Sequence, residues 1–477
     1  MIFLKTSVTS LVGASFVALL GIIIGMMNPW APELSSLGHT VLMLLLITIG
    51  LWVFKPFNLP FSMSSIFLMA SLLIVGLPLP QVFAGFTSAA VWTLIPALFF
   101  GYVILKTGLG KRIALLLLKQ FNPSFTSLMI TFALIGIVLS MLTPAIVVRI
   151  AIMIPIALSC LEACKVKGNS REGALILLTA LMTALIPGTG WLTGSLFGPI
   201  IQGLYETVPE LSGVVTFNSW AKVALLPLGI VAILLIVGGY FLFKPQKKLD
   251  ITKETFVEDY KKLGAMTAPE KWSAIILTLS FVMFLTSGFG LHTLPDQAIV
   301  LGATFLLAVT GVLQANDVGT GVNWDNVIFI GTAMSLSAVF AGVGLSEWIS
   351  SILVPLLEPI SGNTWVFVYS IVLVMFVWRF FDIAILIPTM AILVPTLPMI
   401  GQEFGIDPLV WVPIFVMVAN SFFLSYTNVF VMVGQSVVGE KGWTQKQINK
   451  YGILYGVACL IALAIAIPYW TSLGLFG

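Results

Sequence analysis

Length, composition and charge limit the kinds of protein that this chain can form. It has 477 residues, of which 59% are hydrophobic and only 9% are charged, and its formal net charge is +3. Because soluble domains carry about 25% charged residues, the composition excludes a soluble protein and predicts one that lies in a lipid bilayer. A net charge this small gives no reason to expect a nucleic-acid partner.

Apolar segments long enough to cross a bilayer recur along the whole chain. A transmembrane helix needs about 20 apolar residues. The N-terminal run is followed by further spans and not by a small-residue cleavage site, so it is interpreted as a first transmembrane helix. The sequence predicts an all-α polytopic membrane protein with about eleven spans, at 9–28, 38–54, 61–76, 88–105, 173–205, 218–243, 271–289, 297–314, 325–343, 408–435 and 450–470.

Two further segments, 111–164 and 346–400, fit no single span because each consists of two apolar halves around a break. The first break is at Thr143-Pro144, where proline removes a backbone donor and clashes with the preceding turn. Both segments are predicted to be re-entrant helical hairpins that enter and leave the membrane on one side. Interrupted segments at corresponding places in two halves are typical of secondary transporters built from an inverted repeat.

The distribution of basic residues predicts the orientation of the chain. Cytoplasmic loops of membrane proteins collect Lys and Arg. With the N-terminus in the cytoplasm, all 22 Lys and Arg residues fall on the cytoplasmic side except Lys222 and the two hairpin residues Arg149 and Arg379. The prediction is therefore a multi-pass protein of the cell membrane with a cytoplasmic N-terminus. Its first hairpin opens from the cytoplasm and its second from outside.

The longest polar stretch, residues 244–270, separates the two halves. It is predicted to be a cytoplasmic linker, and the spacing of Phe256 and Tyr260 suits a short interfacial helix within it. A solvated linker without a helix is the alternative. Residues 1–37 then form an N-terminal transmembrane helix with an outer loop. Residues 38–243 form the first repeat, and 271–477 form the second, inverted repeat.

Charged side chains inside the hairpins are the first candidates for a functional site. A charge at membrane depth is costly and marks function by default. Arg149 is predicted to bind an anion, or else to donate to carbonyls at the hairpin tip or pair with Asp382. Arg379 and Asp382 lie three residues apart and would share a helix face. There are two interpretations of these residues. They form a local ion pair, or Asp382 carries a coupling proton.

Breaks in two later spans supply the other candidates. The first contains Pro187, Gly188, Thr189 and Gly190. Helix N-termini that point into a break favour an anion. We therefore predict a substrate site made of Thr143, Pro144, Arg149, Gly188, Thr189, Gly190, Ser425, Thr427 and Asn428. The predicted ion-coupling residues are Asp382, Arg379 and Asn420.

No enzymatic motif and no metal site is expected. The three cysteines, at 160, 164 and 459, form no CxxC pair and lie in apolar runs, so they are interpreted as packing thiols. The sequence has no HExxH and no GxSxG motif. It predicts a protein that is not an enzyme and has no cofactor other than a possible coupling sodium ion or proton.

This arrangement resembles the divalent anion/sodium symporter family of dicarboxylate, citrate and sulfate carriers. The resemblance covers nearly the whole chain. It rests on the stretch 106–112 (KTGLGKR), on the two hairpins and the two broken spans, and on the stretch 405–408 (GIDP). Thr143-Pro144 followed by Arg149 is similar to the Thr-Pro-Ser-Asn-Thr-Ala-Arg hairpin of citrate/succinate antiporters and plastid 2-oxoglutarate/malate translocators.

The chain departs from this family where the family binds its ligands. The Ser-Asn-Thr triplet, whose oxygens bind sodium and the substrate carboxylate in the family, falls on Ala145-Ile146-Val147. The second hairpin also lacks the triplet and holds Arg379, Asp382 and Thr389 instead. A sodium ion would therefore depend on backbone carbonyls for most of its ligands.

The resemblance implies a secondary active transporter of small anions, most of all di- or tricarboxylates. It also implies alternating access by an elevator-like motion, in a homodimer. A cation/proton antiporter of the same broad superfamily is the alternative, although more buried acids than the one at position 382 would be expected for it. The expected partners are the lipid bilayer and a small anionic substrate.

Overall fold

The computed structural model describes residues 8–246, 249, 252–382 and 385–476. The described residues form helices and turns, with one isolated bridge between Ile406 and Phe476. Ten of the described helices are long and apolar enough to cross a membrane. The predicted all-α polytopic fold is confirmed. Residues 247, 248, 250 and 251 of the predicted linker, and 383–384 of the second hairpin, lie outside the described part.

The helices of the first half follow the predicted spans closely. Each apolar run continues until a proline, a glycine or a polar cluster ends it. The predicted interruption near Pro187 separates α10 from α11. The bounds are α1 Val8–Met27, α2 Ser36–Phe54, α3 Phe61–Ile74, α4 Leu79–Val82, α5 Ala84–Thr87, α6 Ala89–Thr107, α7 Leu109–Leu118, α8 Phe125–Leu142, α9 Ile146–Ala163, α10 Arg171–Leu185, α11 Phe197–Glu206 and α12 Phe217–Leu242.

A short helix in the linker, α13 (Lys253–Lys262), leads into the second half. The interruption predicted near Ser425 separates α22 from α23. The bounds here are α14 Ala268–Gly288, α15 Asp296–Val309, α16 Asp317–Thr320, α17 Trp324–Gly342, α18 Leu345–Ser361, α19 Thr364–Trp378, α20 Ile387–Leu393, α21 Leu397–Phe404, α22 Trp411–Ala419, α23 Val429–Val438 and α24 Gln445–Ser472.

The two halves repeat the same order of elements. A long helix, α6 or α17, is followed by an elbow helix, α7 or α18, and the residue before each elbow helix is a glycine in the left-handed region, Gly108 (φ 78°) or Gly344 (φ 75°). A helical pair comes next, then a broken helix and a last long helix. The packing is reciprocal, since α3 packs on α17 and α15 packs on α6. The inverted orientation of the second half stays a prediction.

The helical pairs begin later than the sequence suggested. The range predicted for the first hairpin, 111–164, takes in the elbow helix α7, and the paired arms are α8 and α9. The range predicted for the second, 346–400, takes in α18, and its arms are α19 and the run α20–α21. A glycine with positive φ turns the chain before each elbow helix, which separates that helix from the span before it. Re-entry into the membrane stays a prediction.

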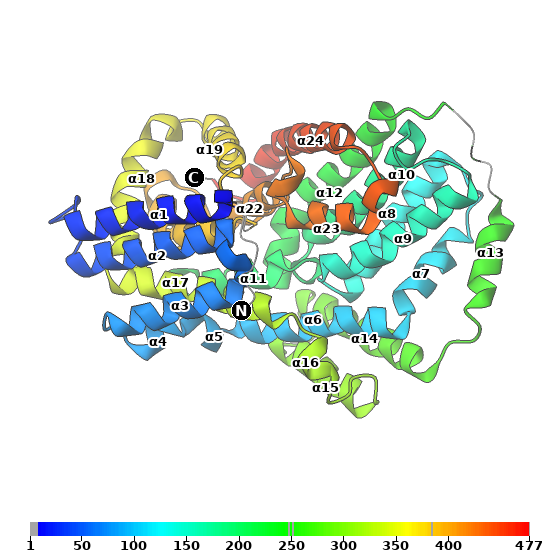
Figure 1. Cartoon of the computed structure of the whole chain (residues 1–477), viewed down its shortest axis with the longest axis horizontal. Coiled ribbons are helices and arrows are strands. Elements are labelled where there is room, and N and C mark those ends of the chain that lie inside the picture. Colours follow the sequence, from blue (N-terminus) through cyan, green and yellow to red (C-terminus); the bar gives the residue numbers. More distant parts are fainter. Residues whose placement is uncertain (1–7, 247–248, 250–251, 383–384, 477) are drawn as a thin grey trace.

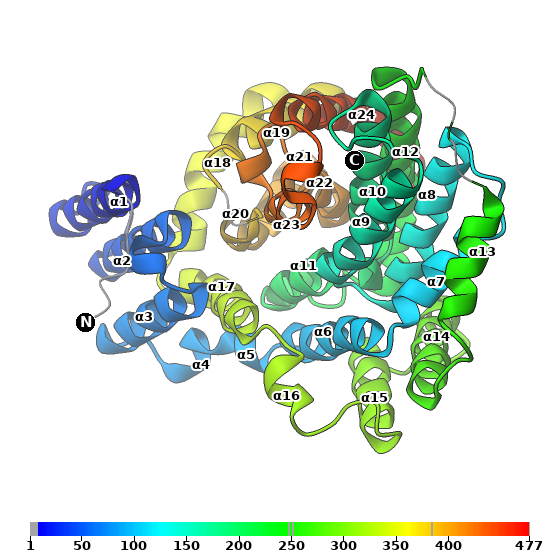
Figure 2. The ribbon, with the colours of Figure 1, turned by 45° about the vertical axis from the view of Figure 1, so that its right-hand side comes forward.

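The broken helices lie in the centre of one bundle. Every residue of α10 except Arg171 is buried, and so is every residue of α22. Helix α10 packs on α8, α9 and α12, and α22 packs on α12 and α19. In Figure 1, α1 and α2 lie at the opposite end of the molecule from α8, α9 and α10. In Figure 2, α1, α2 and α3 stand apart from this bundle. The breaks are therefore enclosed by protein, as irregular backbone at membrane depth requires.

The predicted orientation can be tested by labelling. A single cysteine placed at exposed Thr252 should react with a membrane-impermeant maleimide only from the cytoplasmic side. A cysteine at exposed Gly213 should react only from outside. The native cysteines 160, 164 and 459 are buried, and the parent protein without added cysteines is the control. Labelling of both positions from one side would contradict the inverted repeat.

Candidate functional site

The tip of the first hairpin is an extended stretch between α8 and α9. The backbone of Thr143 is extended (φ −155°, ψ 133°), as expected for a residue that precedes a proline. Its hydroxyl accepts a hydrogen bond from the backbone N–H of Ala145 at 3.1 Å. Thr143 and Pro144 also line a small cavity against α6 and α14, together with Thr193 and Ser280.

The break after α10 is folded tightly against this tip. Two short 3-10 turns, at Pro187–Gly190 and Leu192–Gly194, connect α10 to α11. A Cβ added to Gly188 would lie 2.4 Å from the Cβ of Ser140 on α8, so only glycine fits there. The Thr189 hydroxyl donates to the Ile186 carbonyl at 2.6 Å. That bond stays inside the break, and the role of Thr189 in substrate binding stays a prediction.

Arg149 joins the hairpin tip to the break. The side chain is completely buried. Its Nε donates to the carbonyl of Ala184 at 2.7 Å, and its Nη1 donates to the carbonyls of Thr143 at 2.7 Å and Gly194 at 2.8 Å. Nη2 has no partner among the described residues. Of the three interpretations of Arg149, the structure shows hydrogen bonds to hairpin-tip carbonyls, and the described ion pairs include none with Asp382.

Arg379 does the same in the second half. It follows the last residue of α19 and is completely buried. Its Nη1 donates to the backbone carbonyl of Asp382, and its Nη2 donates to the carbonyls of Thr427 and, at 3.4 Å, Ala419. The expected side-chain ion pair with Asp382 is not formed in the described residues, because the guanidinium binds the backbone of that residue instead.

The two arginines make matching sets of contacts. Each guanidinium donates to a carbonyl of its own hairpin, to a carbonyl at the end of the helix before the break, and to a carbonyl within the break or just at its end. Each therefore holds three separate chain segments together with one rigid, permanently charged group. Two guanidinium charges lie buried at the breaks, and carbonyl dipoles alone face them among the described hydrogen bonds.

Asn428 caps the helix that follows the second break. Its Oδ1 accepts from the backbone N–H groups of Phe430 (2.9 Å) and Val431 (3.3 Å), and its Nδ2 donates to the carbonyl of Asn420 at 3.0 Å. Asn420 keeps a buried Oδ1 without a described partner. Asn428 therefore stabilises the break itself, whereas Asn420 retains an oxygen for another donor.

The remaining predicted residues of the two breaks make contacts elsewhere. The hydroxyl of Thr427 donates to the carbonyl of Leu424 at 2.7 Å, so only its backbone meets Arg379. Ser425 donates to Gln445 on α24 at 3.1 Å in an exposed position. Gly190 packs against Leu225 of α12. These three residues shape the breaks and bring no free polar side chain to them.

Asp382 lies at the end of the described part of the first arm of the second hairpin. One carboxylate oxygen, Oδ2, accepts from the hydroxyl of Thr389, and that hydroxyl accepts from the indole N–H of Trp378 at 2.8 Å. The other oxygen, Oδ1, is buried without a described hydrogen-bond partner. Thr389 thus joins the site as a residue that orients the predicted coupling carboxylate.

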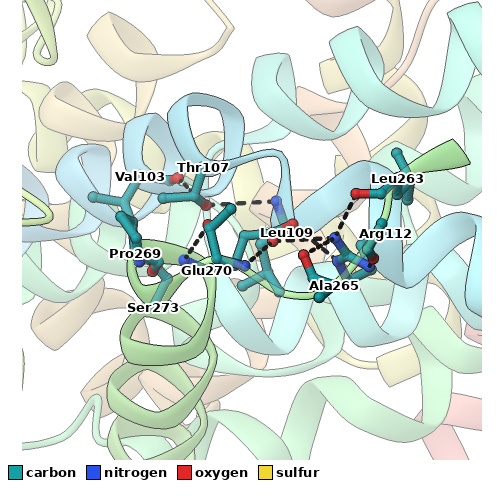
Figure 3. Close-up of polar contacts among 11 residues, drawn as sticks. Val103, Thr107, Leu109, Arg112, Leu263, Ala265, Pro269, Glu270 and Ser273 are labelled. Carbon is teal, nitrogen blue, oxygen red and sulfur yellow. Dashed lines mark hydrogen bonds and ion pairs between the residues drawn. The ribbon is translucent and has the colours of Figure 1, made fainter.

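Two ion pairs that the sequence did not reveal fix the elbow between α6 and α7. Arg112 binds Glu270 of α14 through two bonds, Nε to Oε1 at 2.9 Å and Nη2 to Oε2 at 3.1 Å, and donates to the carbonyls of Leu263, Gly264 and Ala265 (Figure 3). These bonds to Glu270 raise the pKa of Arg112. The elbow is thereby attached to the end of the linker and the start of the second half.

Lys106 forms the second of these pairs, with Asp317 of α16. Its Nζ lies 2.5 Å from Oδ2 of Asp317, whose Oδ1 accepts from the hydroxyl of Tyr102 at 2.7 Å. Burial alone raises the pKa of Asp317, but the hydrogen bonds from Lys106 and Tyr102 outweigh burial and hold that pKa below its usual value. The stretch 106–112 therefore has a structural role. The sequence contains only a weak signal for the partners of this stretch, because Asp317 and Glu270 each lie more than a hundred residues from the basic residue that they bind.

Comparison with known proteins now identifies the family. The family described as the transmembrane region of sodium:sulfate symporters matches residues 8–476. The chain belongs to the sodium:sulfate symporter family. This confirms the resemblance seen in the sequence, and because the family and the relatives below are transporters, it agrees with the prediction that the protein is not an enzyme.

Relatives within this family are named as carboxylate transporters. The chloroplastic dicarboxylate transporter 1 of Arabidopsis thaliana is 26% identical over 68% of this chain and 59% of its own length. A putative malate transporter of Bacillus subtilis is 25% identical over 67% of each chain. The citrate/succinate antiporter of Escherichia coli is 27% identical over 61% of this chain and 60% of its own length. The chain spans about three fifths of the chloroplast relatives.

A solved structure shares the fold at lower sequence similarity. The crystal structure of the Alcanivorax borkumensis YdaH transporter, described as having an unusual topology, matches 98% of this chain and 99% of its own. The TM-score is 0.57 and the sequence identity is 14%. The likeness covers both halves of the chain and so applies to the whole arrangement of helices.

Replacing Arg149 should destabilise the protein more than replacing an exposed arginine. Arg149→Met leaves the carbonyls of Thr143, Ala184 and Gly194 without a donor, and each loss costs about 1–3 kcal/mol. Arg149→Lys restores one donor group without the planar fork, so we expect an intermediate loss. Thermal unfolding of the purified variants measures the loss of stability in each. The control is Arg171→Met, at the exposed start of α10. Equal melting temperatures for all three would show that the buried hydrogen bonds contribute nothing.

The Arg112–Glu270 pair should show strong coupling in a double-mutant cycle. Both side chains are nearly buried, at 7% and 6% exposure. Arg112→Met or Glu270→Met alone leaves an uncompensated charge and should cost about 3–5 kcal/mol, while the double variant should recover part of that loss. Unfolding free energies of the four proteins give the coupling. The exposed pair Lys262–Asp259, with 72% and 42% exposure, is the control and should couple much more weakly, because solvent screens it.

Proposed function

We propose that this protein is a secondary active transporter of small anions, with di- or tricarboxylates as the substrate class. The observation that carries the proposal is the pair of buried guanidinium charges at the two breaks. No carboxylate pairs with either charge among the described ion pairs. Fixed positive charge in a site of low dielectric constant attracts an anion and repels a cation.

Two uncapped helix N-termini in the first half add to this preference. Neither α9 nor α11 has a side chain that caps its first turn, so amide N–H groups remain for an anion there. The names of the relatives support carboxylates within this class. We propose that alternating access moves the hairpins and broken helices together, by an elevator-like motion in a homodimer.

Transport should proceed without sodium. A sodium ion needs several oxygen ligands, and the carbonyls that converge at each break already accept bonds from a guanidinium. In this proposal the two arginines take the place of a coupling cation. Exchange against an internal anion, or proton movement through Asp382, then supplies the driving force.

A cation/proton antiporter is the second candidate, favoured by the buried carboxylate of Asp382 alone. The two guanidinium charges near the breaks count against it, because a transported cation would have to approach them. The same transport experiment separates the two candidates.

Proteoliposomes with labelled malate, citrate, sulfate and sodium test the proposal directly. We expect saturable uptake of at least one anion into vesicles preloaded with unlabelled anion. The rate should change less than about twofold when external sodium is replaced by potassium. Protein-free liposomes are the control. Uptake of sodium without any anion would overturn the proposed substrate class, and anion uptake that disappears in potassium would show that carbonyls still build a sodium site.

A further inference from the structure

An aromatic cavity lies between α2 and the second hairpin. Its volume is about 340 Å³. Trp52 and Phe54 from the end of α2 form one wall, and Trp378 and Phe381 from the end of α19 form another. Trp378 and Phe381 are 49% and 65% exposed, so the cavity is open on that side. None of these aromatic residues has a part in the proposed anion site.

A buried carboxylate belongs to the same cavity. Asp382 lines it and is 8% exposed. The bonds from Trp378 to Thr389 and from Thr389 to Oδ2 of Asp382 fix the orientation of the carboxylate. No described ion pair involves this carboxylate, since Arg379 donates to the backbone carbonyl of the same residue. The charge of the neighbouring Arg379 attracts this carboxylate, but no described cation contacts it. Burial of a negative charge is costly, and a cation that enters the cavity would reduce the cost that remains.

We propose that this cavity is a binding site for an organic ammonium ion. The faces of Trp and Phe rings attract cations through the ring quadrupole, and a group of such rings is the usual recognition element for alkylated ammonium groups. The carboxylate of Asp382 supplies the opposite charge, and the apolar remainder of the walls suits alkyl or aryl substituents on the nitrogen.

Other ligand classes fit these walls poorly. A metal ion such as Mg²⁺ or Ca²⁺ needs about six or more oxygen ligands, whereas the residues around the cavity are mainly aromatic and aliphatic. An anionic substrate would be repelled by Asp382. A neutral hydrocarbon would fill the volume but would leave the carboxylate without a counter-charge.

Occupation of the cavity should also affect transport, a consequence that rests on the proposed function. The two walls come from α2, which belongs to the end of the molecule apart from the bundle, and from a hairpin that the proposed motion displaces (Figure 2). A ligand that touches both walls would hold them in one arrangement. Binding itself does not depend on this consequence and can be measured without transport.

Calorimetric titration of the purified protein with benzyltrimethylammonium chloride tests the site. Neopentylbenzene, its uncharged carbon isostere, is the matched ligand. We expect saturable binding of the ammonium ion and binding of the isostere at least about tenfold weaker, because the isostere lacks the charge that the rings and the carboxylate attract. Equal affinities, or no binding of the ammonium ion, would overturn the proposal whether or not the protein transports anions.

Two variants locate the binding within the cavity. Asp382→Asn keeps the shape and an acceptor for Thr389 but removes the charge, and Trp378→Leu removes one ring. Each variant should bind the ammonium ion about tenfold more weakly. The variant Trp365→Leu, at the other end of α19, should bind it with unchanged affinity. The melting temperature of each variant shows that it is folded. Unchanged affinity in a folded Asp382→Asn protein would place the ligand elsewhere and overturn the assignment.

A second pair of titrations distinguishes a free ammonium ion from the ammonium group of a lipid. Short-chain phosphatidylcholine carries the same trimethylammonium group, and short-chain phosphatidylglycerol lacks it. If Asp382→Asn weakens binding of phosphatidylcholine and does not change binding of phosphatidylglycerol, a lipid supplies the ammonium group. If benzyltrimethylammonium binds and neither lipid does, the site takes a free ammonium ion.

Discussion

Backbone carbonyls in two broken helices are the constraint on which this structure depends. A helix that stops inside a membrane leaves its last carbonyls without intrahelical partners, and lipid cannot supply any. Here a guanidinium meets them in each half. Arg149 and Arg379 reach the breaks from hairpins that lie beside them, so the hairpin, the break and the arginine form a single unit. The tight packing at Gly188 and the N-cap at Asn428 depend on that unit being in place.

Much of the fold could be predicted because its signals are local. Apolar runs of fixed length predict spans, and Thr143-Pro144 predicts a break. The positions of Arg149 and Arg379 in apolar sequence also pointed to the breaks. What the sequence could not show was the bonding partner of each guanidinium, because backbone carbonyls such as those of Ala184 and Ala419 have no signature in the sequence.

Long-range partners were missed for a similar physical reason. Arg112 and Glu270 meet only because the linker returns the chain to the elbow, and no periodicity within either segment encodes that meeting. The hydroxyl of Thr389 could be seen as polar but not as the group that orients Asp382. Side chains expected to bind a ligand, Thr189 and Thr427 among them, turn out to satisfy carbonyls one turn away, which is a common fate of hydroxyls near helix ends.

The permanence of the two guanidinium charges has a consequence for energy coupling. A dissolved cation leaves with its cargo, but an arginine stays with the protein through every step of a cycle. With Asp382 protonated, a divalent anion bound at the breaks would make the loaded unit close to neutral, whereas the empty unit would carry both positive charges across the bilayer. Membrane voltage would then act mainly on the empty return, at about 2.3 kcal/mol per charge for each 100 mV. Such a carrier would favour exchanging one divalent anion for another over returning empty.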